Sequence, residues 1–194
     1  RQAMAEILGP QRLGPLTPLV GKWEGNVGVD LSYHNEDDVT GETSYFEKAW
    51  FRPIPKQENG RQSMEGLTYQ MTAWRHGEEA MDPFHDEVGY LLWDKARGQI
   101  MRAVVFGRGI AILAGSSAQP RDKVLHFNAK PGEASYGILQ NPYLLERAEL
   151  KDFKSTFTVH DDGTLSYTSD LLLKLAATGS EMHHTDRNTL HRVD

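Results

Sequence analysis

The sequence predicts an all-β fold: a single ten-stranded antiparallel β-barrel whose strands run up and down in chain order. The first strand-like segment opens with Gly21-Lys22-Trp23-Glu24-Gly25, and the last one carries Arg192 near its end, as expected where a barrel joins its first strand to its last. Between them lie segments with a two-residue period and hardly any amphipathic helix. Closing the sheet removes the strand edges that favour aggregation.

The N-terminal segment differs from the rest of the chain. We expect residues 1–18 to form an arm or short helix and residues 19–194 to form the barrel domain. The first eight residues suit one or two helical turns, which the Gly-Pro pairs at 9–10 and 14–15 would end. Three leucines either plug one end of the barrel or belong to a loosely packed arm. They are Leu13, Leu16 and Leu19.

From residue 20 onwards the dominant period is two, which is typical of strands. The first strand has five positions of one parity that are apolar or glycine: Trp23, Gly25, Val27, Val29 and Leu31. Nine further strands are expected, at about 42–52, 64–76, 86–94, 99–106, 109–117, 122–130, 149–160, 164–176 and 181–193. Turn sequences such as Asn59-Gly60 separate them, and short connections imply antiparallel neighbours.

The longest irregular stretch spans residues 131–148 and contains Pro131-Gly132 and Asn141-Pro142. Long loops without structure of their own are often functional. This stretch is therefore either a lid over the barrel mouth or a long surface connection.

Composition narrows the class of protein. A chain of 194 residues suits one domain, and the absence of cysteine excludes thiolate catalysis and Cys-ligated zinc or haem. A net charge of -6 is opposite to that of a broad nucleic-acid surface. No apolar run is long enough to span a membrane as a helix. We expect a cytoplasmic protein without a nucleic-acid partner.

The last strand is unusually polar. Alternation puts His184 and Asp186 on one face, and His183, Thr185 and Arg187 on the other. Neither face is cleanly apolar, so either the barrel interior is polar or a bulge swaps the faces midway. Two adjacent histidines ensure that one of them points inward if this strand belongs to the barrel wall.

His85 and Glu87 lie two residues apart at the start of an expected strand, so they share a face. In one interpretation, the carboxylate holds His85 at the barrel rim. In the other, His85 is a polar group over a pocket, where the two side chains could serve as an acid/base pair without a cofactor. The residues themselves leave both interpretations open.

Arginine and tryptophan supply further candidates for ligand contacts. Arg102, Arg108 and Arg187 could each anchor a carboxylate in the cavity, because a guanidinium grips a carboxylate with two hydrogen bonds. Trp23 could line a pocket for a flat ligand, although such residues more often fill a core, and we expect it to cover the barrel base.

Four motifs together resemble nitrobindin, a family of barrels similar to lipocalins and fatty-acid-binding proteins. They are Gly21-x-Trp23-x-Gly25-x-x-Gly28, Phe46-Glu47, Pro83-Phe84-His85-x-Glu87-x-Gly89-Tyr90 and Leu190-x-Arg192. The resemblance covers about residues 19–193. It implies ferric haem b in an open barrel mouth, with a histidine of the last strand as axial ligand and His85 near the open face. It also implies nitric oxide or peroxynitrite chemistry, with isomerisation of peroxynitrite to nitrate as the associated activity.

The last strand departs from the family pattern Pro-Leu-x-x-His-Leu. Ungapped matching from Met182 puts Thr185 at the ligand position, and His184 takes it if the register slips by one. Our first hypothesis is a haem b barrel with His184 on the iron and with His85, Thr185, Arg187 and Trp23 as further contacts. The alternative is a barrel without haem that binds a fatty acid or another small apolar or aromatic acid, anchored by Arg187 or another inward arginine. A homodimer through the barrel wall stays open.

Overall fold

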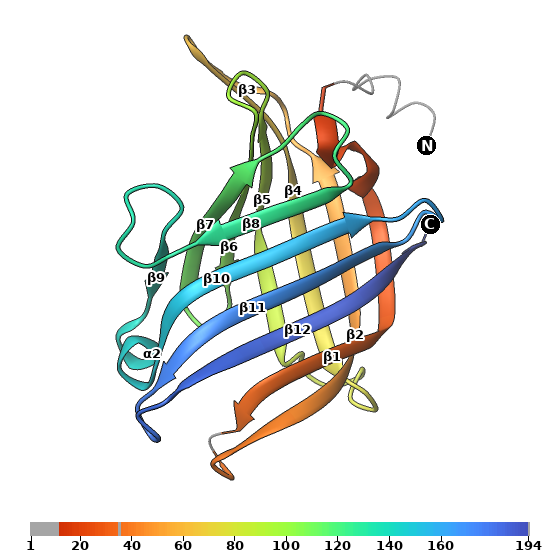
Figure 1. Ribbon diagram of the computed structural model, residues 1–194. Coiled ribbons are helices and arrows are strands. Elements are labelled where there is room, and N and C mark those ends of the chain that lie inside the picture. The colour runs from red at the N-terminus through yellow and green to blue at the C-terminus, as the bar shows by residue number, and fades with distance from the viewer. Residues whose placement is uncertain (1–11, 35, 194) are drawn as a thin grey trace.

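The computed structural model describes residues 12–34 and 36–193 and confirms the predicted fold class (Figure 1). Its closed barrel is built from β1 (Gly21–His34), β2 (Val39–Pro53), β4 (Gln62–Arg75), β5 (His85–Asp94), β6 (Gln99–Phe106), β7 (Ile110–Ser117), β8 (Val124–Ala129), β10 (Ala148–Val159), β11 (Leu165–Leu175) and β12 (Glu181–Val193). Two short strands, β3 (Gln57–Asn59) and β9 (Ile138–Gln140), are additional. The described helices are the 3-10 helix η1 (Gly14–Leu19) and α2 (Pro142–Arg147), and neither is long and apolar enough to cross a membrane.

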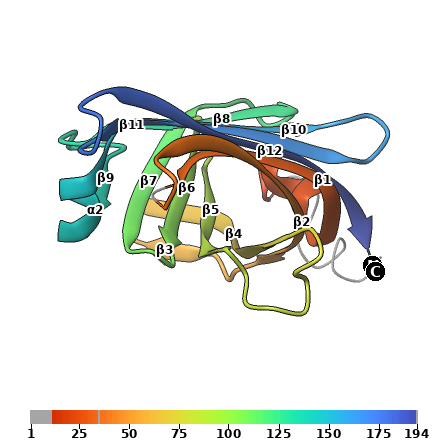
Figure 2. The same cartoon turned by 90° about the horizontal axis from the view of Figure 1, so that it is seen from below.

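Each barrel strand pairs antiparallel with its neighbours in the chain, and β1 pairs with β12 to close the ring. Seen from below, β8, β10, β11 and β12 form one wall and β4 and β5 belong to the opposite one (Figure 2). At the closure Trp23 lies opposite Arg192, whose guanidinium stacks 4.3 Å from the indole centroid. The same guanidinium donates to the backbone oxygens of Val20 and Pro18. The predicted junction of first and last strands is therefore present.

A β-bulge interrupts β1, because its pairing with β2 shifts register between Gly25 and Gly28. The expectation that one parity runs through the whole strand is wrong beyond Gly25. Val27 is 59% exposed, and Asp30 instead turns inward and is buried. Gly28 is needed here, because a Cβ at this position would lie 2.4 Å from the Tyr45 ring.

The end of the barrel beside η1 is filled by apolar side chains. Leu13, Leu16 and Leu19 are buried in the main core cluster, in agreement with the plug interpretation. Gly14 has a φ of +52°, and a Cβ there would lie 2.6 Å from the Trp93 indole nitrogen. Glycine therefore lets η1 approach the ring. The helical turns expected over residues 1–8 lie outside the described residues.

The stretch 131–148 has structure that the sequence analysis did not predict. β9 pairs with β7, and Asn141 caps α2 by accepting the Leu144 backbone N–H at 3.0 Å. Pro142 at the first helical position suits this cap. Leu144 and Gln140 line the cavity described below, so this segment forms part of its wall.

The closure makes a first prediction. We expect Arg192→Lys to lower the free energy of unfolding by about 1 kcal/mol, because lysine loses the planar contact with Trp23 and the forked donation to two carbonyls. Urea denaturation followed by tryptophan fluorescence measures this. Arg187→Lys, an exposed position on the same strand, is the control and should change stability by less than about 0.5 kcal/mol. Equal losses in both variants would contradict the role of Arg192.

Candidate functional site

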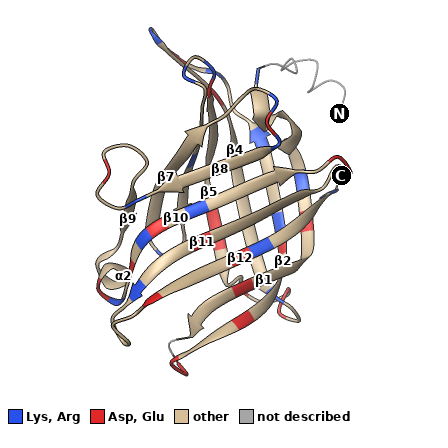
Figure 3. Cartoon of the chain, viewed as in Figure 1, with Lys and Arg blue, Asp and Glu red and all other residues tan. Residues whose placement is uncertain are grey.

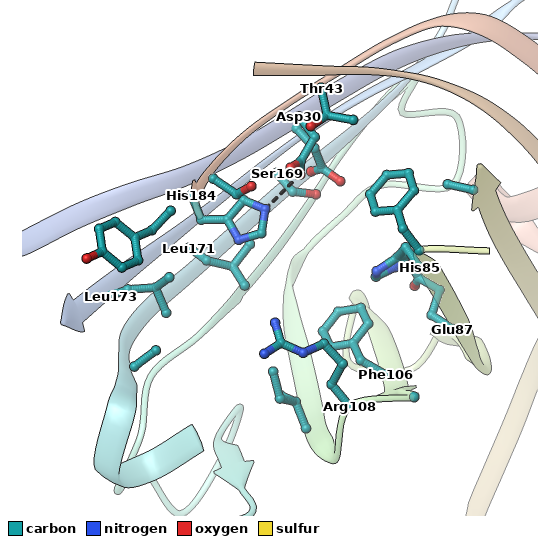
Figure 4. A pocket seen from close by; sticks show the side chains of 18 of the residues that line it. Asp30, Thr43, His85, Glu87, Phe106, Arg108, Ser169, Leu171, Leu173 and His184 are labelled. Carbon is teal, nitrogen blue, oxygen red and sulfur yellow. Dashed lines mark hydrogen bonds and ion pairs between the residues drawn. The ribbon is translucent and has the colours of Figure 1, made fainter. Parts of the chain in front are cut away.

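A cavity of about 800 Å³ lies inside the barrel, a size typical of small-molecule sites. Part of its lining is apolar: Phe106, Ile110, Leu144, Leu150, Leu171, Leu173 and Leu175. Carboxylates, histidines, arginines and tyrosines make up much of the rest. In Figure 4, His184, Asp30, Leu171 and Leu173 stand on one side of the cavity and His85, Phe106 and Arg108 on the other.

His184 is the inward histidine of the last strand. Its Nε2 lies 2.7 Å from Oδ1 of Asp30, and both residues line the cavity. Burial alone would lower the pKa of His184, but the hydrogen bond and the charge of Asp30 raise it above its ordinary value. Burial would likewise raise the pKa of Asp30, yet the hydrogen bond with His184 lowers it. The two side chains are hydrogen-bonded, and each favours the charged form of the other.

The other predicted residues of β12 lie outside the cavity. His183 is exposed, with Nδ1 2.7 Å from Oδ1 of Asp170, and neither Thr185 nor Arg187 belongs to the cavity lining. Strand β12 pairs with β11 in continuous register from Glu181 to Leu190, so no bulge swaps its faces. The polar character of β12 therefore reflects a polar interior, which His184 and Asp186 line.

Asp186 lacks compensation of its own. It stands directly opposite Asp30 in the β1–β12 pairing, and both line the cavity. Within the part of the chain that the structure describes, its buried Oδ1 has no hydrogen-bond partner. Burial raises the pKa of Asp186 to about 6, although the positive charges of His85 and His184 oppose this.

The opposite wall carries a buried ionic network. Glu87 Oε2 accepts Arg102 Nη2 at 2.6 Å and the Tyr69 hydroxyl at 2.7 Å, and its Oε1 accepts His85 Nε2 at 3.0 Å. Burial would raise the pKa of Glu87, but the charge of Arg102, with the hydrogen bond and charge of His85, lowers it to about 2. Burial would lower the pKa of His85, whereas Glu87 raises it to about 9. His85 is thus held by a carboxylate and also lines the cavity, so both structural parts of the two earlier interpretations hold.

A chain of hydroxyl groups leads to a second buried acid. The Tyr45 and Tyr167 hydroxyl oxygens are 2.6 Å apart, and the Tyr167 hydroxyl donates to Glu47 Oε1 at 2.8 Å. Asn188 Nδ2 donates to the same oxygen at 3.2 Å. Burial raises the pKa of Glu47 to about 8, even though the Tyr167 hydrogen bond lowers it.

The remaining candidates divide between cavity and core. Arg102 is buried, but Glu87, Tyr69 and Ser155 engage its nitrogens, and Arg108 lines the cavity. Trp23 is buried in the core, where its Nε1 donates to the Leu19 carbonyl oxygen at 2.8 Å, and it does not belong to the cavity lining.

Among the polar cavity residues, sequence analysis did not single out Asp30, Tyr45 and Tyr167, and it named Glu47 only within the motif Phe46-Glu47. Uninterrupted alternation puts Asp30 on the outside, and only the bulge in β1 turns it inward. The available signal was Glu47, a charge that shares parity with the apolar positions Tyr45 and Phe51 of its strand.

The fold and the cavity define a small-ligand-binding β-barrel. The chain belongs to the family of the THAP4-like, heme-binding beta-barrel domain, whose sequence model matches residues 12–192, and this confirms the nitrobindin resemblance. Thirteen chains of solved structures match, among them the crystal structure of Rv2717c from M. tuberculosis. That match has a TM-score of 0.61 and 21% identity, covers 94% of this chain and 97% of the other, and shows the common fold. A comparison with curated proteins gave no match.

The buried network makes a second prediction. Glu87→Gln should lower the free energy of unfolding by about 3–5 kcal/mol, because Arg102 would keep a buried charge without its counter-ion. Chemical denaturation measures the loss. Glu24→Gln removes a carboxylate from an exposed pair with Lys48 at 3.9 Å and should cost less than about 1 kcal/mol. A loss in Glu87→Gln no larger than in this control would contradict the network's role.

A third prediction concerns pH. The folded-state pKa of His85, about 9, lies above its ordinary value of 6.5. Protonated His85 therefore stabilises the fold fully below pH 6.5, and this contribution is lost as the pH rises through about 9. The stability difference between the wild type and His85→Gln, measured by urea denaturation, should shrink over this range. A difference that grows with pH would contradict the assigned ion pair with Glu87.

Proposed function

We propose that this barrel binds haem b in its cavity, with His184 as the axial iron ligand. One observation carries the proposal: the inward imidazole donates its Nε2–H to Oδ1 of Asp30 at 2.7 Å, which leaves the other ring nitrogen to bind iron. Histidines that bind metals usually donate the other ring N–H to a carboxylate, which orients the ring and makes it a better ligand. Bound haem supplies an iron centre to which a small molecule such as nitric oxide can bind.

The residues that line the cavity around His184 suit haem b. Leu171 pairs with His184 in the sheet, and Leu173 follows on the same face, so apolar side chains flank the proposed ligand. Phe106 and Ile110 supply apolar surface from β6 and β7. Arg108 lines the cavity at the turn between those strands, where a guanidinium can pair with a haem propionate. Family membership in a heme-binding barrel domain supports the same proposal.

An apolar acid is the second candidate ligand. Arg108 on the cavity wall favours it, because its guanidinium could hold a carboxylate. Arg187, one of three arginines that the sequence offered as anchors, is exposed on the outer face and offers no such contact inside. We therefore prefer haem.

A titration of the purified chain with hemin tests the haem proposal and makes a fourth prediction. We expect a saturable Soret band in the wild type, and at least about tenfold weaker binding in His184→Ala because the axial ligand is lost. His183→Ala is the matched control, since His183 also pairs with an aspartate at 2.7 Å but on the outer face. No saturable band, or unchanged binding in His184→Ala, would refute the assignment.

Other expectations stay predictions: peroxynitrite chemistry, a cytoplasmic location, the division at residues 18 and 19, and the lid role of 131–148. In the view of Figure 3 the Lys and Arg positions are scattered over the strands, which supports the expectation of no nucleic-acid partner.

A homodimer is supported by the outer face of β5, β6 and β7. There Val88 pairs with Val105, and both are about half exposed, as are Tyr90 and Leu113.

A further inference from the structure

The pairing of Asp30 with Asp186 is an unfavourable feature of the β1–β12 closure. The two carboxylates occupy directly opposite positions and both line the cavity. Like charges at such positions destabilise a sheet. His184 compensates Asp30, whereas Asp186 Oδ1 is buried without a partner among the described residues. An unpartnered buried carboxylate oxygen is costly, so it points to a donor from outside the chain.

Several donors near this region already serve other acceptors. Arg102 donates to Glu87, Tyr69 and Ser155. Nε2 of His184 is bound to Asp30, and Nε2 of His85 is bound to Glu87.

The hydroxyl and amide groups of this region are engaged as well. The Tyr45 hydroxyl lies 2.6 Å from that of Tyr167, which donates to Glu47, and Asn188 Nδ2 also donates to Glu47. One cavity acceptor, the buried Oδ1 of Asp186, is left without a hydrogen-bond partner among the described residues.

The charged residues of the cavity indicate the charge of a ligand that would bind Asp186. Seven carboxylate residues line the cavity against three arginines, no lysine, and His85 and His184, whose pKa values are raised. Arg102 is neutralised by Glu87, and burial raises the pKa of Glu47 to about 8, as expected for an acid without a positive partner. The phenol rings of Tyr45 and Tyr167 border the same region, and aromatic rings beside carboxylates are typical of ammonium sites.

We propose that the inner part of this cavity binds the ammonium group of a small amine, with Asp186 as its principal acceptor and Glu47 as the second. The apolar part of the amine then faces the apolar residues of the lining, such as Leu171 and Leu173. This site does not depend on haem: it uses residues other than His184, and a family match to heme-binding domains does not assign it.

Benzylammonium chloride is a suitable probe, because an alkylammonium group is charged at pH 7. Isothermal titration calorimetry and thermal unfolding of the chain without hemin compare it with benzyl alcohol and benzoate, which have similar shape but no charge or the opposite charge. We expect saturable binding of benzylammonium, a melting temperature that rises with its concentration, and affinity at least about tenfold above that of either control.

Two variants locate the site. Asp186→Asn should weaken benzylammonium binding by about tenfold or more, since it removes the charged acceptor while keeping the shape of the side chain. Asp170→Asn, a carboxylate on the outer face beside His183, should leave binding unchanged. Unchanged binding in Asp186→Asn would overturn the proposal.

Equal affinity for benzylammonium and benzyl alcohol, or tighter binding of benzoate, would also overturn it. This ligand comparison needs no variant, so it decides the question even if Asp186→Asn fails to fold. Because hemin is absent throughout, failure here leaves the haem proposal intact, and failure of the hemin titration leaves this one intact.

Discussion

The pairing of β1 with β12 is the interaction on which the rest of this structure depends. It closes the sheet into a ring, and it stacks Arg192 on Trp23. The same pairing brings Asp30 to His184 and opposite Asp186. Closing the barrel therefore also assembles this part of the cavity, because β1 and β12 carry Asp30, His184 and Asp186.

The interior holds many charged groups, and most of them are compensated locally. Glu87 is surrounded by Arg102, Tyr69 and His85, and Asp30 is paired with His184. Such pairs cost desolvation energy that a hydrophobic core would not, so their presence indicates a function rather than a gain in stability. Asp186 is the exception, and its uncompensated oxygen marks the place where a ligand has most to contribute.

Alternation and turn chemistry predicted the ten barrel strands well, because each strand has one face toward the core. β9 and α2 were missed, since strand β9 has only three residues and exists by pairing with β7. The start of α2 carried a local signal that went unused: asparagine before proline is a common cap and first helical residue. Among the site residues, sequence analysis singled out His85, Glu87, His184 and Asp186 but could not say which parity of the last strand faces inward.

The sequence alone determined the class of fold, its closure through Trp23 and Arg192, and the inventory of polar side chains on the last strand. These follow from local periodicity and from residue chemistry, which do not require three-dimensional information. Tertiary structure decided which of those side chains share the cavity. A single bulge in β1 reverses the faces of that strand and turns Asp30 inward, and the register with β12 decides that it meets His184 and Asp186. Register is a property of two strands together, so neither strand's sequence contains it.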